Sequence, residues 1–388
     1  MLLILFTIIS AVENTEIKEA LEKNDQHLAV AKIQEYLDKG QNVPLNIAVT
    51  GETGVGKSTF VNAIRGIDNK DEKAAPTGCV ETTMKVTPYP HPNYPNYLKM
   101  VEFKKFDFFI IISADRFREN DVKLAKEIQK MEKKFYFVRS KIDDNIRNEE
   151  RGQREFNEER TLTQIRDNCI QGLQDLRLQS PQVFLVSSVD LTLYDFPLLV
   201  ETLKEELPEL KKEAFLLAMP NISVDMIKEK KKAFKAKVKY FAILSAGVGA
   251  VPVPGVSAAV DTTLLVSVVT KYVLGFGLDI PSLKRMANYS GVPYEELKKV
   301  IMSTLIAVKV TPELLLRLLV QFSSLTALLA AEEGTRFIPI IGIPVSMGLS
   351  FAFTYSSLNM ILDTLADDAE KVFTRVCRCQ QTPVVSLC

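Results

Sequence analysis

The residues of this chain with the clearest chemical potential form a glycine-rich run in its first quarter. Gly51, Gly56, Lys57 and Ser58 fit the spacing of the phosphate-binding pattern GxxxxGK[ST]. The run follows an apolar, strand-like segment and opens a helical stretch, which is the context that gives the pattern its meaning. The candidate nucleotide-binding residues of the run are Gly51, Glu52, Thr53, Gly54, Val55, Gly56, Lys57, Ser58 and Thr59.

The chemistry of this run would be the binding of phosphates and of Mg²⁺. Backbone N–H groups of the turn and of the helix N-terminus would point at the phosphates. Lys57 would reach the β- and γ-phosphates, and the Ser58 hydroxyl would ligate Mg²⁺. The alternative is a chance glycine-rich turn. The strand, the helix and the later strands follow in the expected order, which argues against that alternative.

A second run, Ser140-Lys141-Ile142-Asp143, follows the apolar segment FYFVR and has the chemistry to read guanine. It fits the pattern [NT]KxD with serine in the first place. The carboxylate of Asp143 would accept hydrogen bonds from N1 and the 2-amino group of guanine, a donor pair that adenine lacks. The stem of Lys141 would lie over the purine plane. The alternative is a helix N-cap with a solvated charge pair.

Apolar segments of strand length alternate with amphipathic segments of helix length up to about residue 190. The expected strands are 45–50, 84–89, 107–113, 135–140 and 182–188. One expected helix follows the glycine-rich run and ends near Arg65, and two others span 119–133 and 156–178. This alternation predicts an α/β domain whose mostly parallel sheet has helices on both faces. The last strand ends at Ser187 and Ser188, which would form a second base-binding loop.

The pattern becomes almost wholly helical from about residue 197, and an amphipathic helix or helix pair at 13–39 precedes the first strand. We place the boundary between the two domains near 195–220. The expected parts are an apolar segment with an amphipathic helix at 1–40, the nucleotide-binding domain at 41–195, an all-helical domain at 196–375 and a cysteine-containing tail at 376–388.

The composition argues against several classes of function. The 388 residues include 48 Lys plus Arg and 48 Asp plus Glu, so the chain has no net charge and is not expected to bind nucleic acid. With only two histidines, His27 and His91, histidine-based metal sites and Ser–His–Asp hydrolysis are disfavoured. Five scattered cysteines fit a reducing compartment. The apolar residues 1–10 lack the basic region of a secretory signal, so a cytoplasmic protein is expected.

Two long apolar stretches, 241–275 and 337–364, leave several roles open for the helical part. We expect a buried helical pair that forms the core of the second domain. Reversible association with a membrane through an apolar face, and true membrane spanning, are the alternatives. The lysine-rich run 228–239 is either a solvated helix face or a surface that attracts anionic lipid.

The chain closely resembles the immunity-related GTPases, the interferon-inducible p47-type family, and especially its fish members. The resemblance covers residues 30–375 and is carried by GETGVGKSTFVNAIRG, AAPTGCVETTMKVTPYPHPNYPN, FKKFDFFIIISADRFRENDVKLAKEI and FYFVRSKID. The phosphate-binding run has the GKS form of the family and not the GMS form of its regulatory subclass. The resemblance implies a GTP-binding G domain that takes GTP or GDP with Mg²⁺. It also implies that Thr77 and Thr83 lie in the first switch loop and that Thr83 supplies a Mg²⁺ ligand.

The family role that this resemblance implies is that of a dynamin-like GTPase of cell-autonomous innate immunity. Such a protein is cytoplasmic and associates peripherally with intracellular membranes, including pathogen-containing vacuoles. It forms homo- or hetero-oligomers with related GTPases.

One element of a GTPase is missing from the sequence, because none of the 17 glycines has an aspartate three residues before it and a DxxG turn therefore does not occur. Family members carry a WDLPG-type segment where Asn96 here runs directly into Tyr97. The resemblance thus implies the loss of a strand and a switch, roughly 20 residues. That strand would lie between the phosphate-loop strand and 84–89.

Two explanations compete: the sequence as written omits a segment of the real protein, or the protein is a degenerate GTPase. We favour the first, because loss of a central strand should exceed the roughly 5–15 kcal/mol of net stability of a domain. Three functional hypotheses follow. They are an active GTPase, a nucleotide-binding but hydrolytically inactive partner of related GTPases, and a helical membrane protein with a vestigial G domain. Catalytic residues are not assigned.

Overall fold

A computed structural model describes residues 12–23, 25–41, 43–77, 106–114, 119–174, 182–248, 257–303, 310–311 and 345–381. The chain divides into two compact units. One, which we call the sheet unit, is Asn42–Ser223; the other, the helical unit, combines Met1–Gln41 with Val224–Cys388. Each is described by itself.

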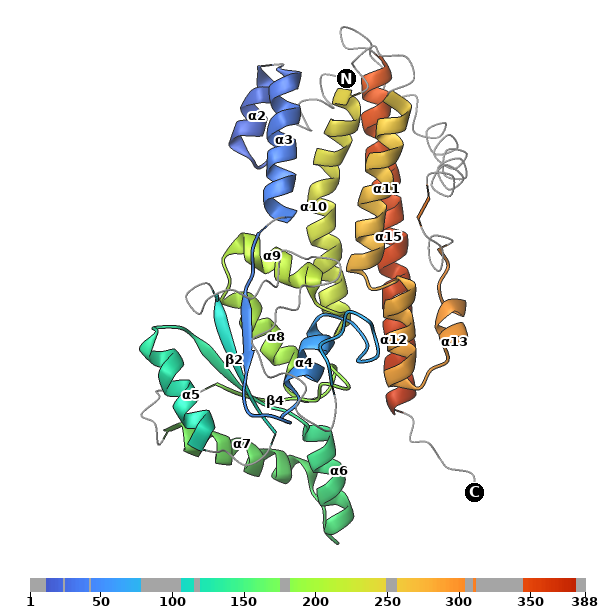
Figure 1. The fold of residues 1–388 in the computed structure, drawn as a ribbon. Helices are drawn as coiled ribbons and strands as arrows, with labels where there is room; N and C mark the ends of the chain where they lie inside the picture. The colour runs from blue at the N-terminus through green and yellow to red at the C-terminus, as the bar shows by residue number, and fades with distance from the viewer. Residues whose placement is uncertain are drawn as a thin grey trace. The chain divides into compact units, whose positions relative to one another are not determined.

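In the part of the sheet unit that the structure describes, four parallel strands lie in the order β1-β2-β3-β4 (Figure 1). The strands are β1 (Ile47–Thr50), β2 (Phe108–Ser113), β3 (Phe135–Arg139) and β4 (Val183–Leu185). Val49 pairs with Ile110, Ile110 with Tyr136, and Val138 with Phe184. All six residues of β2 are buried, which explains its uninterrupted apolar sequence. The predicted α/β fold with a parallel sheet is confirmed, while the expected strand at 84–89 lies outside the described residues.

Helices cover the sheet. They are α4 (Lys57–Ile64), α5 (Glu119–Lys130), α6 (Ile142–Gly152), α7 (Glu158–Gln174), α8 (Phe196–Glu205) and α9 (Glu209–Ala218). One core cluster joins the strand residues Phe109, Ile111 and Phe137 to Ile128 of α5 and Leu173 of α7. Elsewhere in the unit, Phe60 of α4 and Phe196 of α8 lie with ring centroids 6.0 Å apart. The helix α6, which begins inside the Ser140–Asp143 run, is not among the elements expected from the sequence.

Helices α8 and α9 belong to the sheet unit, whereas the sequence pattern assigned residues from 196 onward to the helical domain. The contacts explain the difference. Asp107, at the start of β2, accepts the backbone N–H of Asn46 at 2.8 Å and forms an ion pair with Lys211 of α9. The buried face of α8 includes Phe196 and Leu203. A change to helical composition therefore does not mark the boundary here.

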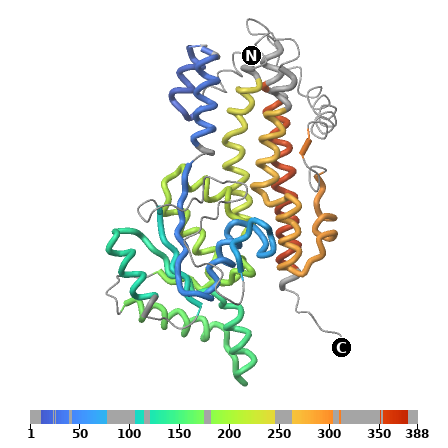
Figure 2. The backbone as a smooth tube through the Cα atoms, viewed as in Figure 1, coloured from blue at the N-terminus to red at the C-terminus, as the bar shows by residue number. Residues whose placement is uncertain are grey.

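The helical unit contains helices from both ends of the chain. They are α2 (Thr15–Glu22), α3 (Gln26–Gln41), α10 (Val224–Val248), α11 (Ser257–Gly275), α12 (Ile280–Ser290), α13 (Tyr294–Lys299) and α15 (Val345–Gln381). The long helices α10, α11 and α15 run side by side (Figure 2). In the core of the unit, the ring of Phe234 lies 4.8 Å from that of Tyr272, and Thr354 donates a hydrogen bond of 2.9 Å to Ser245. Helix α15 continues to Gln381, into the segment expected to be a tail.

Among the described residues, one helical stretch, Thr263–Ser290, is long and apolar enough to cross a membrane by length and composition alone. Within its most apolar window, 44% is buried inside the protein. The core helix of a protein that never enters a bilayer passes the same test, so this stretch is weak support for a membrane span.

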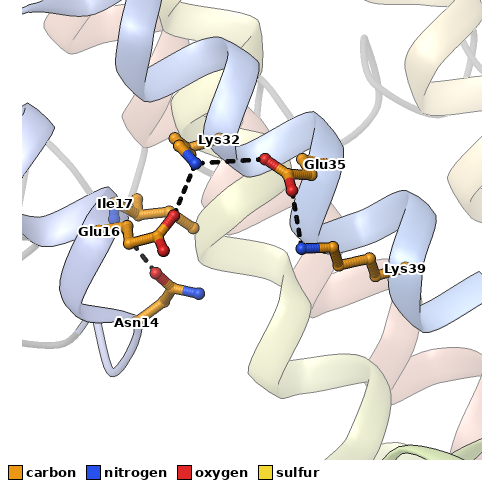
Figure 3. Close-up of polar contacts among 6 residues, drawn as sticks. All are labelled: Asn14, Glu16, Ile17, Lys32, Glu35 and Lys39. Carbon is orange, nitrogen blue, oxygen red and sulfur yellow. Dashed lines mark hydrogen bonds and ion pairs between the residues drawn. The ribbon is translucent and has the colours of Figure 1, made fainter.

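The N-terminal helix pair is joined by a polar network at its surface (Figure 3). The side chain of Asn14 caps α2 by accepting the N–H of Ile17 at 3.2 Å. Lys32 of α3 lies 2.7 Å from Glu16 of α2 and 3.4 Å from Glu35, which in turn lies 2.7 Å from Lys39. Hydrogen bonding to Glu16 and Glu35 raises the pKa of Lys32, but pairs at such an exposed surface contribute little to stability.

A buried lysine lies in the core of the helical unit. Lys230 of α10 is 1% exposed, and its Nζ donates a hydrogen bond of 2.8 Å to the carbonyl of Gly275, the last residue of α11. Burial, with a smaller contribution from the charge of Arg285, lowers the pKa of Lys230 to about 7. The amine is therefore close to its titration point near neutral pH.

This lysine makes the stability of the helical unit depend on pH. Between about pH 7 and pH 10.5 the unfolded chain holds the Lys230 proton and the folded chain releases it, so stability rises with pH. Below pH 7 both states hold the proton, and this contribution is flat. We expect the free-energy difference between wild type and Lys230→Met to shift in favour of wild type from pH 7 to pH 9.5. Urea unfolding followed by circular dichroism measures it, and an unchanged difference contradicts the assignment.

Candidate nucleotide-binding site

The glycine-rich run forms the turn between β1 and α4, at the carboxyl end of the parallel sheet. This edge is where open α/β sheets bind ligands. Three glycines of the turn have left-handed backbone angles, with φ of 144° at Gly51, 84° at Gly54 and 94° at Gly56. L-residues with side chains rarely adopt these angles, so the path of the turn depends on glycine.

Gly51 also permits a close approach between the turn and the sheet. A Cβ atom placed on Gly51 would lie 2.0 Å from the carbonyl oxygen of Ile112 in β2 and 3.3 Å from Val55 Cγ2. Neither the strand backbone nor the turn has room for that atom. By contrast, a Cβ on Gly54 would meet nothing within 4 Å.

Helix α4 begins directly after the turn, with Gly56 as its N-cap and no side-chain capping hydrogen bond. The positive end of the helix dipole is thus presented at the turn. Ser58 and Thr59 lie half-buried in the first turn of α4. This arrangement suits an anion such as phosphate.

Lys57 folds its side chain back over the turn. Its Nζ donates hydrogen bonds to the carbonyl of Gly51 at 3.0 Å and to the carbonyl of Glu52 at 2.6 Å. These two bonds hold the ammonium group over the loop that would surround the phosphates. The same group is the one expected to contact the β- and γ-phosphates of a bound nucleotide.

The guanine-reading run is hydrogen-bonded to the glycine-rich turn, although 84 residues separate Lys57 from Lys141. The Oγ of Ser140, which is 1% exposed, donates to the carbonyl of Val55 at 2.6 Å. The Nζ of Lys141 donates to the carbonyl of Gly54 at 2.8 Å. Lys141 itself has a left-handed backbone with φ of 57°, a conformation that is uncommon for residues with a side chain.

Asp143 lies in the first turn of α6, and its side chain is 19% exposed. Its carboxylate forms an ion pair with the guanidinium of Arg147, at 3.8 Å. The charge of Asp143 also acts on the side chain of Tyr194. Burial, with smaller contributions from Glu158 and Asp143, raises the pKa of the Tyr194 hydroxyl to about 12. Lys141 is the N-cap of α6 and makes no side-chain capping hydrogen bond, while Arg147 pairs with Asp143, so base reading and the N-cap alternative both stay predictions.

The loop after β4 adjoins the same run, because the N–H of Ile142 donates to the carbonyl of Val186 at 3.3 Å. Ser187 is fully buried, and its Oγ accepts the N–H groups of Val189 and Asp190 at 3.2 Å each. This hydroxyl therefore shapes the loop. The Oγ of Ser188 is buried without a hydrogen-bond partner in the described part of the chain. A buried hydroxyl of this kind suits a partner from a ligand or a water.

The sequence pattern missed one buried charge beneath this loop. Arg139 ends β3, is 6% exposed, and its Nη1 donates to the carbonyl of Ser140 at 2.9 Å and to that of Ala114. Its guanidinium thus supports the backbone that carries the guanine-reading run. The available signal was an arginine directly at the end of the apolar segment FYFV.

The expected Mg²⁺ ligands are only partly described. Ser58 lies at the turn, Thr77 is the exposed last residue before the gap at 78–105, and Thr83 lies outside the described residues. Within the described ranges, no group of three or more His, Cys, Asp or Glu side chains is placed to hold a metal. Serine and threonine hydroxyls completed by phosphate oxygens and water fit Mg²⁺, which prefers few protein ligands. These residues therefore fit a Mg²⁺ that arrives with a nucleotide.

The fold and this edge of the sheet define a P-loop nucleotide-binding protein of the α/β class. A family model described as Interferon-inducible GTPase (IIGP) matches residues 10–376. The chain belongs to this interferon-inducible, immunity-related GTPase family, and the resemblance noted from the sequence is confirmed.

Curated relatives agree with the family model. The rat protein "Interferon-inducible GTPase 5" is 39% identical over 94% of this chain and 83% of its own length. The mouse protein "T-cell-specific guanine nucleotide triphosphate-binding protein 2" is 36% identical over 93% of this chain and 89% of its own length. The mouse protein "Interferon-gamma-inducible GTPase 10" is 36% identical over 94% of this chain and 89% of its own length. The rat alignment runs over 387 positions but covers 94% of 388 residues here, so the relative carries residues that this chain lacks.

Proposed function

We propose that this protein binds GTP and GDP with Mg²⁺ at the carboxyl edge of its sheet. The carrying observation is that Ser140 and Lys141 donate hydrogen bonds to the carbonyls of Val55 and Gly54. The guanine-reading run is thereby fixed directly against the phosphate loop. A chance glycine-rich turn has no reason to be tied to that run.

Each part of the site has a distinct task in this proposal. The backbone of 51–59 and the N-terminus of α4 hold the phosphates, and Lys57 neutralises their charge. Ser58, with Thr83 as a further ligand, would hold Mg²⁺, which supplies charge neutralisation between the phosphate oxygens. Asp143 selects guanine, Lys141 covers the purine, and the loop at Ser187 and Ser188 closes around the base.

The base selectivity of Asp143 is directly testable. An ionised acceptor that makes two hydrogen bonds to guanine contributes about 1.5–3 kcal/mol for each, so Asp143→Ala should weaken GDP binding at least about 100-fold. ADP binding, which we expect to be weak in wild type, should not change. Titration calorimetry of the full chain with GDP and with ADP measures both.

The neighbouring residue provides a matched control. Asp144 also forms an ion pair with Arg147, at 3.1 Å, but its side chain is 54% exposed. Asp144→Ala should leave GDP affinity within about twofold, in keeping with a surface ion pair. Equal losses in the two variants, or tight binding of ADP by wild type, would show that Asp143 does not read the base.

The wider role follows the family. We propose a GTPase of cell-autonomous immunity that associates peripherally with intracellular membranes and assembles with itself or with related GTPases. The family match supports this, and exposed lysines of α10 such as Lys228, Lys232 and Lys235 suit anionic lipid. Flotation with phosphatidylserine vesicles, and ultracentrifugation with and without GTP, test the two parts; no change in either assay rejects it.

Hydrolysis of GTP is proposed at the level of the family, and no residue is assigned to it. The comparisons give the alternative of an inactive partner no support. Because the sequence as written has no DxxG turn to meet the γ-phosphate, its turnover should be slow. Phosphate release from purified protein measures that turnover.

A further inference from the structure

The helix that follows the phosphate loop, α4, also holds the loop that comes directly after this helix. Asn62 lies on α4, one turn beyond the phosphate-facing residues, and is 1% exposed. Its Nδ2 donates to the carbonyl of Ala75 at 2.9 Å, and its Oδ1 accepts the N–H of Ala75 at 2.7 Å. One buried side chain therefore pairs with both backbone groups of Ala75, which is itself fully buried.

The remaining hydrogen-bonding capacity of this amide is also used. Nδ2 donates to Oδ1 of Asn69 at 2.9 Å, and Oδ1 accepts from Nη1 of Arg65 at 3.4 Å. An asparagine amide has two donors and two acceptor sites, so all four are occupied. A fully satisfied buried amide specifies one arrangement of its partners, because any other leaves a polar group buried without a partner.

Arg65 adds a second attachment of the same loop to the same helix. It follows the last residue of α4, is 3% exposed, and its Nη2 donates to the carbonyl of Lys73 at 2.9 Å. The loop from 66 to 75 is thus held to α4 at two backbone positions. Asp68 and Asp71 form its own turns by accepting the N–H groups of Lys70 at 2.8 Å and Lys73 at 2.7 Å.

The position of this anchor links it to the nucleotide. Helix α4 starts at Lys57, and Asn62 lies on the same eight-residue helix, so α4 connects the phosphate-facing residues to Ala75. Thr77, an exposed hydroxyl two residues after Ala75, is the first side chain beyond the anchor that Mg²⁺ or a phosphate oxygen would accept. Loops of GTPases respond to the γ-phosphate and its Mg²⁺ through such contacts.

We infer that Asn62 is a positioning residue that fixes the chain at Ala75–Thr77 to the phosphate-binding helix and thereby contributes more to the binding of a nucleoside triphosphate than to that of a diphosphate. The inference rests on the proposed nucleotide site and goes beyond it, because Asn62 itself does not touch the nucleotide. It assigns a role to a side chain that the phosphate-binding pattern does not include.

The test compares GDP with the slowly hydrolysed analogue GTPγS, both with Mg²⁺, on the full chain. In Asn62→Ala we expect GTPγS affinity to fall about tenfold while GDP affinity stays within about twofold, since only the anchor bonds are lost. Asn62→Asp, which keeps the size and the acceptor but loses both N–H donors, should move the ratio in the same direction. Hydrogen exchange should show faster exchange of the Ala75 amide in Asn62→Ala.

Two controls separate positioning from stability. Asn69→Ala removes one partner of Asn62 but keeps both bonds to Ala75, so the ratio of the two affinities should be unchanged. Ile128→Val weakens the core between α5 and the sheet, and should lower the melting temperature without moving the ratio. A merely structural role for Asn62 would lower both affinities together.

The outcomes distinguish the inference from the proposed site. Equal losses for GDP and GTPγS in Asn62→Ala, or no change in either despite faster exchange at Ala75, overturn the inference and leave the nucleotide site standing. A wild-type chain that binds GDP but not GTPγS also overturns it, because there is then no triphosphate binding for Asn62 to support. A wild-type chain that binds neither nucleotide overturns the inference and the proposed site together.

Discussion

Lys57→Ala is expected to weaken the binding of both GTP and GDP by at least about 100-fold, since two charge-assisted contacts to phosphate contribute about 1.5–3 kcal/mol each. The structure adds a second loss. Lys57 also holds the carbonyls of Gly51 and Glu52, so its removal frees the turn that aims the backbone N–H groups. Titration calorimetry with GDP and with GTPγS measures the effect.

The control for this variant is a lysine far from the turn. Lys126→Ala, on the exposed side of α5, removes the same charge from the same unit and should leave both affinities unchanged. Lys57→Arg keeps the charge but brings a planar group that is larger than the ammonium, and it should recover little of the affinity. If Lys57→Ala binds GDP as tightly as wild type does, the glycine-rich turn is not part of the nucleotide site.

Gly51→Ala is expected to cost the sheet unit about 3 kcal/mol or more of folding free energy, by overpacking against a strand and by backbone strain. The added methyl would lie 2.0 Å from the carbonyl oxygen of Ile112, and alanine disfavours φ of 144°. Either β1 and β2 separate or the turn leaves its path. We expect a lower urea midpoint and, at the same time, loss of nucleotide binding.

Two other glycines allow the causes to be separated. Gly54→Ala meets nothing within 4 Å, so it should show only the strain of its left-handed angle, about 1–2 kcal/mol. Gly152→Ala, at the end of α6 with ordinary angles and open space, should stabilise by about 0.5–1 kcal/mol. If the three variants unfold at the same urea concentration, the close contact of Gly51 with β2 does not govern stability.

The sequence predicted the parts of this protein that local pattern determines. Buried strands such as β2 are uninterrupted apolar runs, and the phosphate loop carries its own spacing. Contacts between distant segments were harder to predict. Nothing near Lys211 signals its ion pair with Asp107, so α9 was assigned to the wrong side of the change in composition. Asn62 likewise has nothing in the sequence that distinguishes it from an ordinary helix residue, and only its hydrogen bond with Ala75 shows its role.

The site shows the same division. The residue types at 140–143 predicted base recognition, but the bonds from Ser140 and Lys141 to the turn needed the folded chain. Arg139 was missed because a charge at the end of an apolar strand has several uses, and only its bond to the Ser140 carbonyl specifies one. The strand expected at 84–89 and the junction of Asn96 with Tyr97 lie outside the described residues.

The helical unit is assembled from the two ends of the chain, with the sheet unit inserted between them. Tyr36 and Tyr240 show what this means, because their rings lie 4.9 Å apart across more than half of the chain's length in sequence. During translation the sheet unit is complete once Ser223 has left the ribosome, and it is able to fold first, as domains generally do. Helices α2 and α3 emerge before it yet must wait for α10. Their apolar faces are therefore exposed to chaperones throughout that interval, and a ribosome stalled after Ser223 would carry a folded sheet unit with an unpaired N-terminal helix pair.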